Sequence, residues 1–205
     1  TEAFLLDQLQ YAVKILMNSF YGVFASSFYR FTHPDLGASI TEWARHNIRA
    51  IISELDNSGH PVVYSDTDSI FVKSPVGAEA PTSKPDGGDA LDLWSNAKDR
   101  AIEFGNSLAD QFTKEGAELE FETALSAFFS HGAKKRYVGR VVWPREEMLI
   151  RGYEVRRTDS FQLLTDTMTE MFELILNGDA WSSVEMTKTA IDNLRATDVD
   201  ASKLV

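Results

Sequence analysis

The spacing of apolar residues along the chain predicts a mixture of helices and short strands. Apolar side chains recur at helical spacing in five segments, residues 4–21, 41–55, 93–113, 161–176 and 184–194. Two runs rich in β-branched and aromatic residues, 62–64 and 70–72, flank a polar cluster and predict a buried β-hairpin. Residues 117–155 alternate between apolar and polar positions, as the strands of a sheet do.

One long segment has neither pattern. Residues 74–92 are rich in Pro, Gly, Ser and Asp, which predicts a flexible surface loop. No internal repeat is visible in the sequence. Because helices precede and follow the group of strands, we expect an α+β fold in one domain, or in one domain with a small appendage.

Composition limits the classes of protein to which the chain can belong. Its 205 residues include no cysteine and no apolar run of the roughly 20 residues that a membrane span needs. The N-terminal residues lack the basic flank and cleavage site of a signal peptide. These properties predict a soluble cytoplasmic protein without disulfides or thiolate metal sites.

The net charge of −11 argues against a simple nucleic-acid-binding protein, because phosphate contacts come from Lys and Arg. Residues 131–160, the basic segment, reverse this balance with eight basic and four acidic side chains. The basic side chains are Lys134, Lys135, Arg136, Arg140, Arg145, Arg151, Arg156 and Arg157. The segment is either a phosphate-contacting surface or a solvated strand edge whose charges oppose aggregation.

Asp66 and Asp68 lie between the two strands of the predicted hairpin. An Asp-x-Asp pattern alone carries little weight, since Asp198 and Asp200 form a second one in a polar tail. At the tip of an apolar hairpin, however, two neighbouring carboxylates repel each other unless a cation compensates. Carboxylate oxygens without nearby Cys or His select Mg²⁺, for which Mn²⁺ can substitute.

Four motifs, in order along the chain, resemble those of family B DNA polymerases. Residues 64–69 read Y-S-D-T-D-S and match the palm motif, and residues 14–22 match the K-x-x-x-N-S-x-Y-G fingers motif. Residues 134–137, K-K-R-Y, and 152–159, G-x-E-x-x-R-x-D, match two further elements of the family. The resemblance covers most of the chain.

This resemblance implies a polymerase palm, an antiparallel sheet with packed helices, together with one fingers helix and a short helical thumb. Residues 1–30 then form the second fingers helix. Residues 31–155 form the palm, with a metal-binding hairpin at 61–73 and a flexible loop at 74–92. Residues 156–205 form a partial or reduced thumb.

The resemblance also implies a metal site. Asp66 and Asp68 are the catalytic carboxylates and ligands of Mg²⁺, and Asp68 is the ligand expected to bridge two metal ions. The stretch 118–122 resembles the acidic strand of the family, in which the position of Glu122 can approach an additional metal.

Substrate-contacting residues follow from the same motifs. Lys14 and Asn18 serve the incoming nucleotide, and Tyr21 packs near the nascent base pair. The residues implied to contact DNA are Lys134, Lys135, Arg136, Tyr137 and Arg157. Without the resemblance, the polar stripe that Lys14, Asn18 and Tyr21 form on their helix is also typical of an ordinary solvated face.

Asp66 and Asp68 do not complete the metal site that the resemblance implies. The family has another essential Asp in a D-x-x-S-L-Y-P-S motif, which this sequence lacks. Because Thr1 lies just ahead of a helix and Val205 ends a polar tail, we expect a naturally split polymerase rather than an excised fragment. A larger polypeptide then supplies the missing Asp, the other fingers helix and the N-terminal and exonuclease domains.

The sequence therefore predicts template-directed nucleotide addition, with primer-template DNA and dNTPs as substrates and no activity without the partner polypeptide. We expect this activity in the cytoplasm, at the nucleoid if the cell is prokaryotic. The alternative is a non-catalytic DNA-binding accessory subunit that keeps the palm fold. The presence together of Lys14, Asn18, Asp66 and Asp68 favours the enzyme, since plain DNA binding needs none of them.

Overall fold

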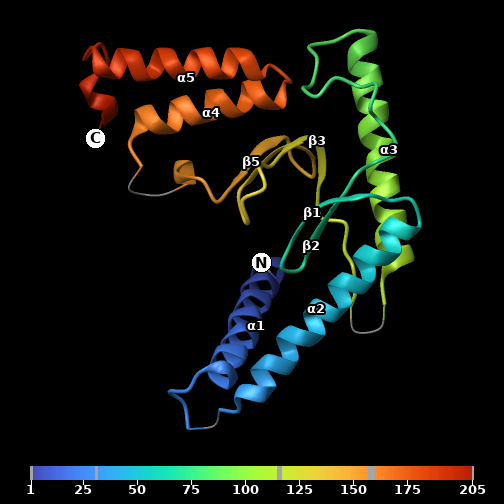
Figure 1. Ribbon diagram of the computed structural model, residues 1–205. Coiled ribbons are helices and arrows are strands. Elements are labelled where there is room, and N and C mark those ends of the chain that lie inside the picture. The colour runs from blue at the N-terminus through green and yellow to red at the C-terminus, as the bar shows by residue number, and fades with distance from the viewer. Residues whose placement is uncertain (1, 31, 115–116, 157–159, 205) are drawn as a thin grey trace. The chain divides into compact units, whose positions relative to one another are not determined.

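The computed structural model describes residues 2–30, 32–114, 117–156 and 160–204, and the chain forms two units (Figure 1). The first unit is Thr1–Phe71 and the second is Val72–Val205. Each unit combines helices with antiparallel strands, which confirms the predicted mixture of α and β structure. No helix in the described ranges has the length and apolar character of a membrane span.

Two long helices open the first unit, α1 (Glu2–Ala25) and α2 (Pro34–Asn57), and they pack on each other. Pro34 begins α2, where its fixed φ suits the first turn and its missing N–H leaves no bond unmade. Gly37 permits the close approach of α1, because a Cβ at this position would lie 2.9 Å from the Cβ of Ala25.

A hairpin of two strands, β1 (Val62–Asp66) and β2 (Ser69–Val72), follows α2, and β1 packs on that helix. The Val62 N–H donates to Oδ1 of Asp56 at 3.1 Å. The rings of Tyr64 and Phe71 meet edge to face with centroids 5.6 Å apart. The predicted hairpin is confirmed, but its strands are half-buried or alternately exposed rather than buried.

Helix α1 is longer than the predicted 4–21 and leaves its apolar side chains in solvent. Leu6, Leu9 and Met17, which the pattern places on the apolar side of the helix, are 59%, 61% and 63% exposed. Within the described part of the first unit, the apolar face of α1 therefore has no cover.

The second unit contains a three-stranded antiparallel sheet in the order β3-β4-β5. The strands are β3 (Ala124–Phe129), β4 (Tyr137–Trp143) and β5 (Glu147–Arg151). Helices α3 (Asp89–Phe112) and α4 (Gln162–Leu176) pack on the sheet, and α5 (Ala180–Arg195) packs on α4. Short 3-10 helices, η1 (Glu154–Arg156) and η2 (Ala201–Leu204), follow β5 and α5.

The core of this unit follows from the alternation of residues along β4. Val138 and Val142 are an even number of residues apart, so they lie on the same face of the sheet. Val138 packs against Phe172 and Leu176 of α4, whereas Val142 packs near Trp94 of α3. Two valines on one face of β4 thus pack against two different helices.

One predicted strand is wrong. Residues 117–123, expected to belong to the sheet, contain no strand. Phe121 stacks on Trp143 instead, with centroids 5.1 Å apart, and its ring occupies the space that a side chain on Gly105 of α3 would need. The sequence alternates there because this segment packs one side against α3, without pairing to a neighbouring strand.

The loop before α3 is bonded to the sheet. Residues 73–88 have no regular structure, as predicted, and α3 begins at Asp89, earlier than the expected residue 93. The Ser126 hydroxyl of β3 donates to the carbonyl of Thr82. Lys84 pairs with Glu146 at 2.9 Å. These bonds fasten the middle of the loop to β3 and to the turn between β4 and β5.

Candidate active site

Asp66 and Asp68 lie at the tip of the first unit's hairpin. Asp66 is the last residue of β1, and Asp68 directly precedes β2. The Asp68 N–H donates to the carbonyl of Asp66 at 2.8 Å, and Thr67 between them has φ of 60°. A bond from residue i+2 back to residue i around a positive φ is the form of a rare and strained γ-turn.

This turn sets the electrostatics of the tip. The Thr67 hydroxyl donates to Oδ1 of Asp66 at 3.2 Å. Asp66 is half-buried and Asp68 is exposed. The two carboxylates lie at the same end of the hairpin with a single residue between them. Hard carboxylate oxygens in this arrangement suit Mg²⁺ or Mn²⁺.

The two carboxylates alone do not form a full metal cage. In the described part of the chain, no group of three or more Asp, Glu or His side chains is placed to hold a metal ion. Glu122, predicted as a ligand of an additional metal, is exposed in the second unit, in the segment that is not a strand. Its role at the metal site stays a prediction.

Lys14, Asn18 and Tyr21 lie on α1, spaced by four and then three residues. That spacing places them along one side of the helix. All three side chains are exposed, and Tyr21 is 41% exposed. Helix α1 packs on α2, which in turn packs on β1, so α2 connects the helix that carries Lys14 with the strand that carries Asp66.

The K-K-R-Y motif lies at the turn between β3 and β4. Lys134, Lys135 and Arg136 are exposed, and Lys135 has φ of 62°. Tyr137 is the first residue of β4, is only 8% exposed, and packs beside Phe128 with ring centroids 5.8 Å apart. Three cations thus extend into solvent from one turn, while the tyrosine anchors that turn in the sheet.

The G-x-E-x-x-R-x-D motif begins directly after β5. Gly152 has φ of 74°, and Glu154 lies in η1. Arg157 and Asp159 of this motif lie outside the described residues. The predicted DNA contact of Arg157 therefore stays a prediction.

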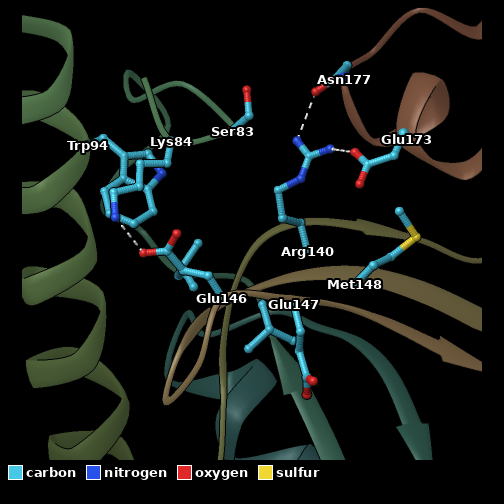
Figure 2. A pocket seen from close by; sticks show the side chains of 11 residues that line it. Ser83, Lys84, Trp94, Arg140, Glu146, Glu147, Met148, Glu173 and Asn177 are labelled. Atoms are coloured by element: carbon cyan, nitrogen blue, oxygen red, sulfur yellow. Dashed lines mark hydrogen bonds and ion pairs between the residues drawn. The ribbon is translucent and has the colours of Figure 1, made fainter. Parts of the chain in front are cut away.

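Arg140 of the basic segment has a structural partner that the sequence did not reveal. Its guanidinium donates to Glu173 of α4 and, at 2.8 Å, to Oδ1 of Asn177, and its side chain is only 13% exposed (Figure 2). These residues border a hollow of about 310 Å³ that Trp94 also lines. Arg140 joins the sheet to α4. Its charge is paired with Glu173, so we do not count it among the candidate phosphate contacts of the basic segment.

Comparison with known proteins relates these features to a family. The sequence model of DNA polymerase family B matches residues 1–84. Over 98% of its length the chain is 32% identical to a DNA polymerase of Thermococcus gorgonarius, of which it covers 24%. Over 94% of its length it is 32% identical to DNA polymerase II of Escherichia coli, of which it covers 25%.

The chain resembles the DNA polymerases of family B. Its fold agrees with this resemblance. All of the chain aligns with a family B DNA polymerase from the archaeon Pyrobaculum calidifontis, with a TM-score of 0.62 and 24% identity. The chain spans about a quarter of the length of the curated family B relatives that it matches.

Proposed function

We propose that the chain carries part of the nucleotidyl-transfer site of a DNA-directed DNA polymerase. The observation that supports this most strongly is the strained turn that holds Asp66 and Asp68 together at a hairpin tip, in a chain that resembles family B polymerases. In this proposal the first unit supplies palm and fingers residues, and the last helices belong to a thumb.

Asp66 and Asp68 would hold the catalytic metal, and Asp68, the more exposed of the two, would be the carboxylate available to a second ion. When bound, Mg²⁺ would lower the pKa of the primer 3′-hydroxyl and neutralise charge on the triphosphate. The Thr67 hydroxyl, by donating to Asp66, fixes the orientation of that carboxylate.

Lys14 and Asn18 bind the incoming nucleotide. A lysine ammonium on an exposed helix face is a mobile point charge that suits a triphosphate, and an amide one turn away adds hydrogen-bonding groups. Tyr21, further along the same side, packs near the nascent base pair.

The turn with Lys134, Lys135 and Arg136 contacts the primer-template backbone, and Arg157 adds a phosphate contact. Three exposed cations on one turn give the local positive charge that backbone contacts need, within a chain of net charge −11. Because phosphate contacts carry no sequence information, this surface suits a polymerase that must act on any template.

A larger polypeptide completes the site. Two carboxylates are fewer ligands than a two-metal centre needs, and the described residues offer no third one beside them. Exposed apolar side chains along α1, including Leu6, Leu9 and Met17, supply a surface for the partner's own fingers helix. The chain is inactive without that polypeptide.

Primer extension with Mg²⁺ tests the proposed function in three arms: the chain, a polypeptide carrying the remaining family B motifs, and their mixture. We expect extension only in the mixture, because only then are all carboxylates present. Extension by the chain alone would remove the need for a partner. A mixture that binds primer-template but never extends it would favour the non-catalytic accessory subunit.

A further inference from the structure

Gly152 lies against the turn that carries the K-K-R-Y motif. A Cβ built on Gly152 would lie 2.0 Å from the carbonyl oxygen of Lys135 and 3.0 Å from Cγ of Arg136. The pairing of Tyr137 with Arg151, between β4 and β5, brings these two segments together. Only a residue without a side chain allows the Lys135 carbonyl to occupy this position.

The turn itself is constrained. Lys135 has φ of 62°, a left-handed conformation that is uncommon for a residue with a side chain. Ser130 braces the turn from within: its hydroxyl donates to the carbonyl of Arg136 at 3.2 Å and accepts the N–H of Gly132 at 3.4 Å. An unusual backbone conformation of this kind persists only where the surroundings hold it.

Besides Gly152, Tyr153 also holds the turn in place. Its ring lies edge to face with His131, at 6.1 Å between centroids, and packs on Phe172 of α4 at 4.8 Å. Phe172 is 1% exposed in the core between the sheet and α4. Tyr153 therefore connects the segment before the K-K-R-Y motif to a helix that is fixed in the core.

The hydroxyl of Tyr153 adds nothing to this packing. It is buried, and the described residues offer it no hydrogen-bond partner. Burial raises the pKa of Tyr153, while the charge of Arg136 lowers it, so the hydroxyl stays neutral and lies within electrostatic reach of the turn. A buried hydroxyl without a partner is destabilising, so the packing of the ring, rather than the hydroxyl, accounts for a tyrosine at this position.

We propose that Gly152 and Tyr153 are positioning residues that fix the turn carrying Lys134, Lys135 and Arg136 against α4. Gly152 lets the Lys135 carbonyl approach, and the Tyr153 ring joins His131 to Phe172. The proposal deepens the function proposed above and rests on it, since these cations are there the contacts to primer-template DNA. It follows that the affinity for DNA depends on two residues that act by positioning the turn rather than by contacting DNA.

Limited proteolysis measures the position of the turn without DNA. Trypsin cleaves after Lys134, Lys135 and Arg136, and cleavage within a folded protein reports local opening. We expect cleavage in this turn to become about tenfold faster in Gly152→Ala and in Tyr153→Ala, as local opening becomes easier. Mass spectrometry separates these cuts from cleavage after Lys188 on exposed α5, which should keep its wild-type rate.

Two variants serve as matched controls. Gly178 has φ of 83°, similar to Gly152, but a Cβ there meets nothing within 4 Å. Gly178→Ala therefore adds the same backbone strain without the clash, and cleavage in the turn should stay at the wild-type rate. Tyr153→Phe keeps the ring and should restore the slow cleavage that Tyr153→Ala loses.

Three results would overturn the proposal. The first is equal cleavage in Gly152→Ala and Gly178→Ala, which would leave the clash without effect. The second is a rate in Tyr153→Phe as fast as in Tyr153→Ala. The third is equal acceleration after Lys188, which would indicate global unfolding. The two positions act through different contacts, so if one variant fails to fold the other still decides.

Fluorescence anisotropy with a labelled primer-template duplex then separates this proposal from the proposed function. We expect Gly152→Ala to bind about three- to tenfold more weakly, with a salt dependence of binding that is shallower by about one phosphate contact. If the wild-type chain does not bind the duplex, the DNA-contacting role of the turn fails, while the proteolysis result still decides whether Gly152 and Tyr153 position it. Wild-type affinity and salt dependence in a variant with fast cleavage would contradict the link between the position of the turn and the affinity for DNA.

Discussion

Thr67 is the residue on which the proposed metal site most directly depends. Its φ of 60° is uncommon for a β-branched residue, and such conformations cost of order 1–3 kcal/mol. The strands on either side hold it in place, and the result is that Asp66 and Asp68 come to the same hairpin tip. Strain of this kind is typical of functional sites.

Replacing Thr67 by glycine should relieve that strain. Glycine adopts positive φ without steric cost, but it loses the hydroxyl bond to Asp66 and adds flexibility to the unfolded chain. We expect the free energy of unfolding of Thr67→Gly to stay unchanged or to rise by up to about 1 kcal/mol, measured by urea denaturation.

Ser69→Gly is the matched control, since Ser69 lies in β2 with no positive φ to relieve. That change should lower the free energy of unfolding by roughly 0.5–1 kcal/mol. Equal losses at the two positions would show that the Thr67 conformation carries no strain.

At the same scale, the sequence predicted the position of some residues of the proposed site and missed the contacts of others. The position of Asp66 and Asp68 at a hairpin tip could be predicted because two short apolar runs on either side define a hairpin. Arg140 could not, because its partner Glu173 lies 33 residues further along the chain and no local pattern links them. The packing role of Tyr153 was also missed, since it depends on contacts with Phe172 and His131, which only the folded sheet and α4 bring together.

Helix α1 is the element whose surroundings differ most from the pattern. Periodicity predicted a helix with one apolar side, and the side chains on that side are exposed in the first unit. A helical period reports which residues share a face and says nothing of whether the cover for that face lies in the same chain. For residues 117–123, alternation similarly identified one packed side without showing that a strand partner was absent there.

The contact between α1 and α2 can be tested with two glycines. A Cβ at Gly37 would lie 2.9 Å from Cβ and 3.2 Å from Cα of Ala25, so Gly37→Ala must push the helices apart. We expect a loss of about 1–3 kcal/mol in the free energy of unfolding, as in other overpacked contacts, partly offset by the better helix propensity of alanine.

Gly22→Ala on α1 provides the control. A Cβ there meets nothing within 4 Å, so only the propensity gain remains, about 0.5–1 kcal/mol of added stability. Thermal unfolding followed by circular dichroism should place the midpoint of Gly22→Ala above, and that of Gly37→Ala below, the wild-type value. Equal midpoints would mean that the helices do not approach as closely as the structure shows.

The whole molecule is a two-unit chain that spans about a quarter of its relatives' length and has a net charge of −11. Two features of the described residues are incomplete in this chain by itself: two clustered carboxylates have no third ligand beside them, and a long helix has its apolar face exposed. A larger polypeptide that packs on α1 and brings a further carboxylate to Asp66 and Asp68 would complete both.

The most direct test of the metal site compares Asp68→Asn with Asp198→Asn, the same change in the second Asp-x-Asp of the sequence, by single-turnover primer extension in the reconstituted mixture with saturating dNTP and Mg²⁺. A catalytic metal contributes several kcal/mol of transition-state stabilisation, so we expect Asp68→Asn to slow extension by about 10²-fold or more. Asp198→Asn should keep the wild-type rate. Equal rates in the two variants would contradict the assignment of Asp68 as a ligand of the catalytic metal.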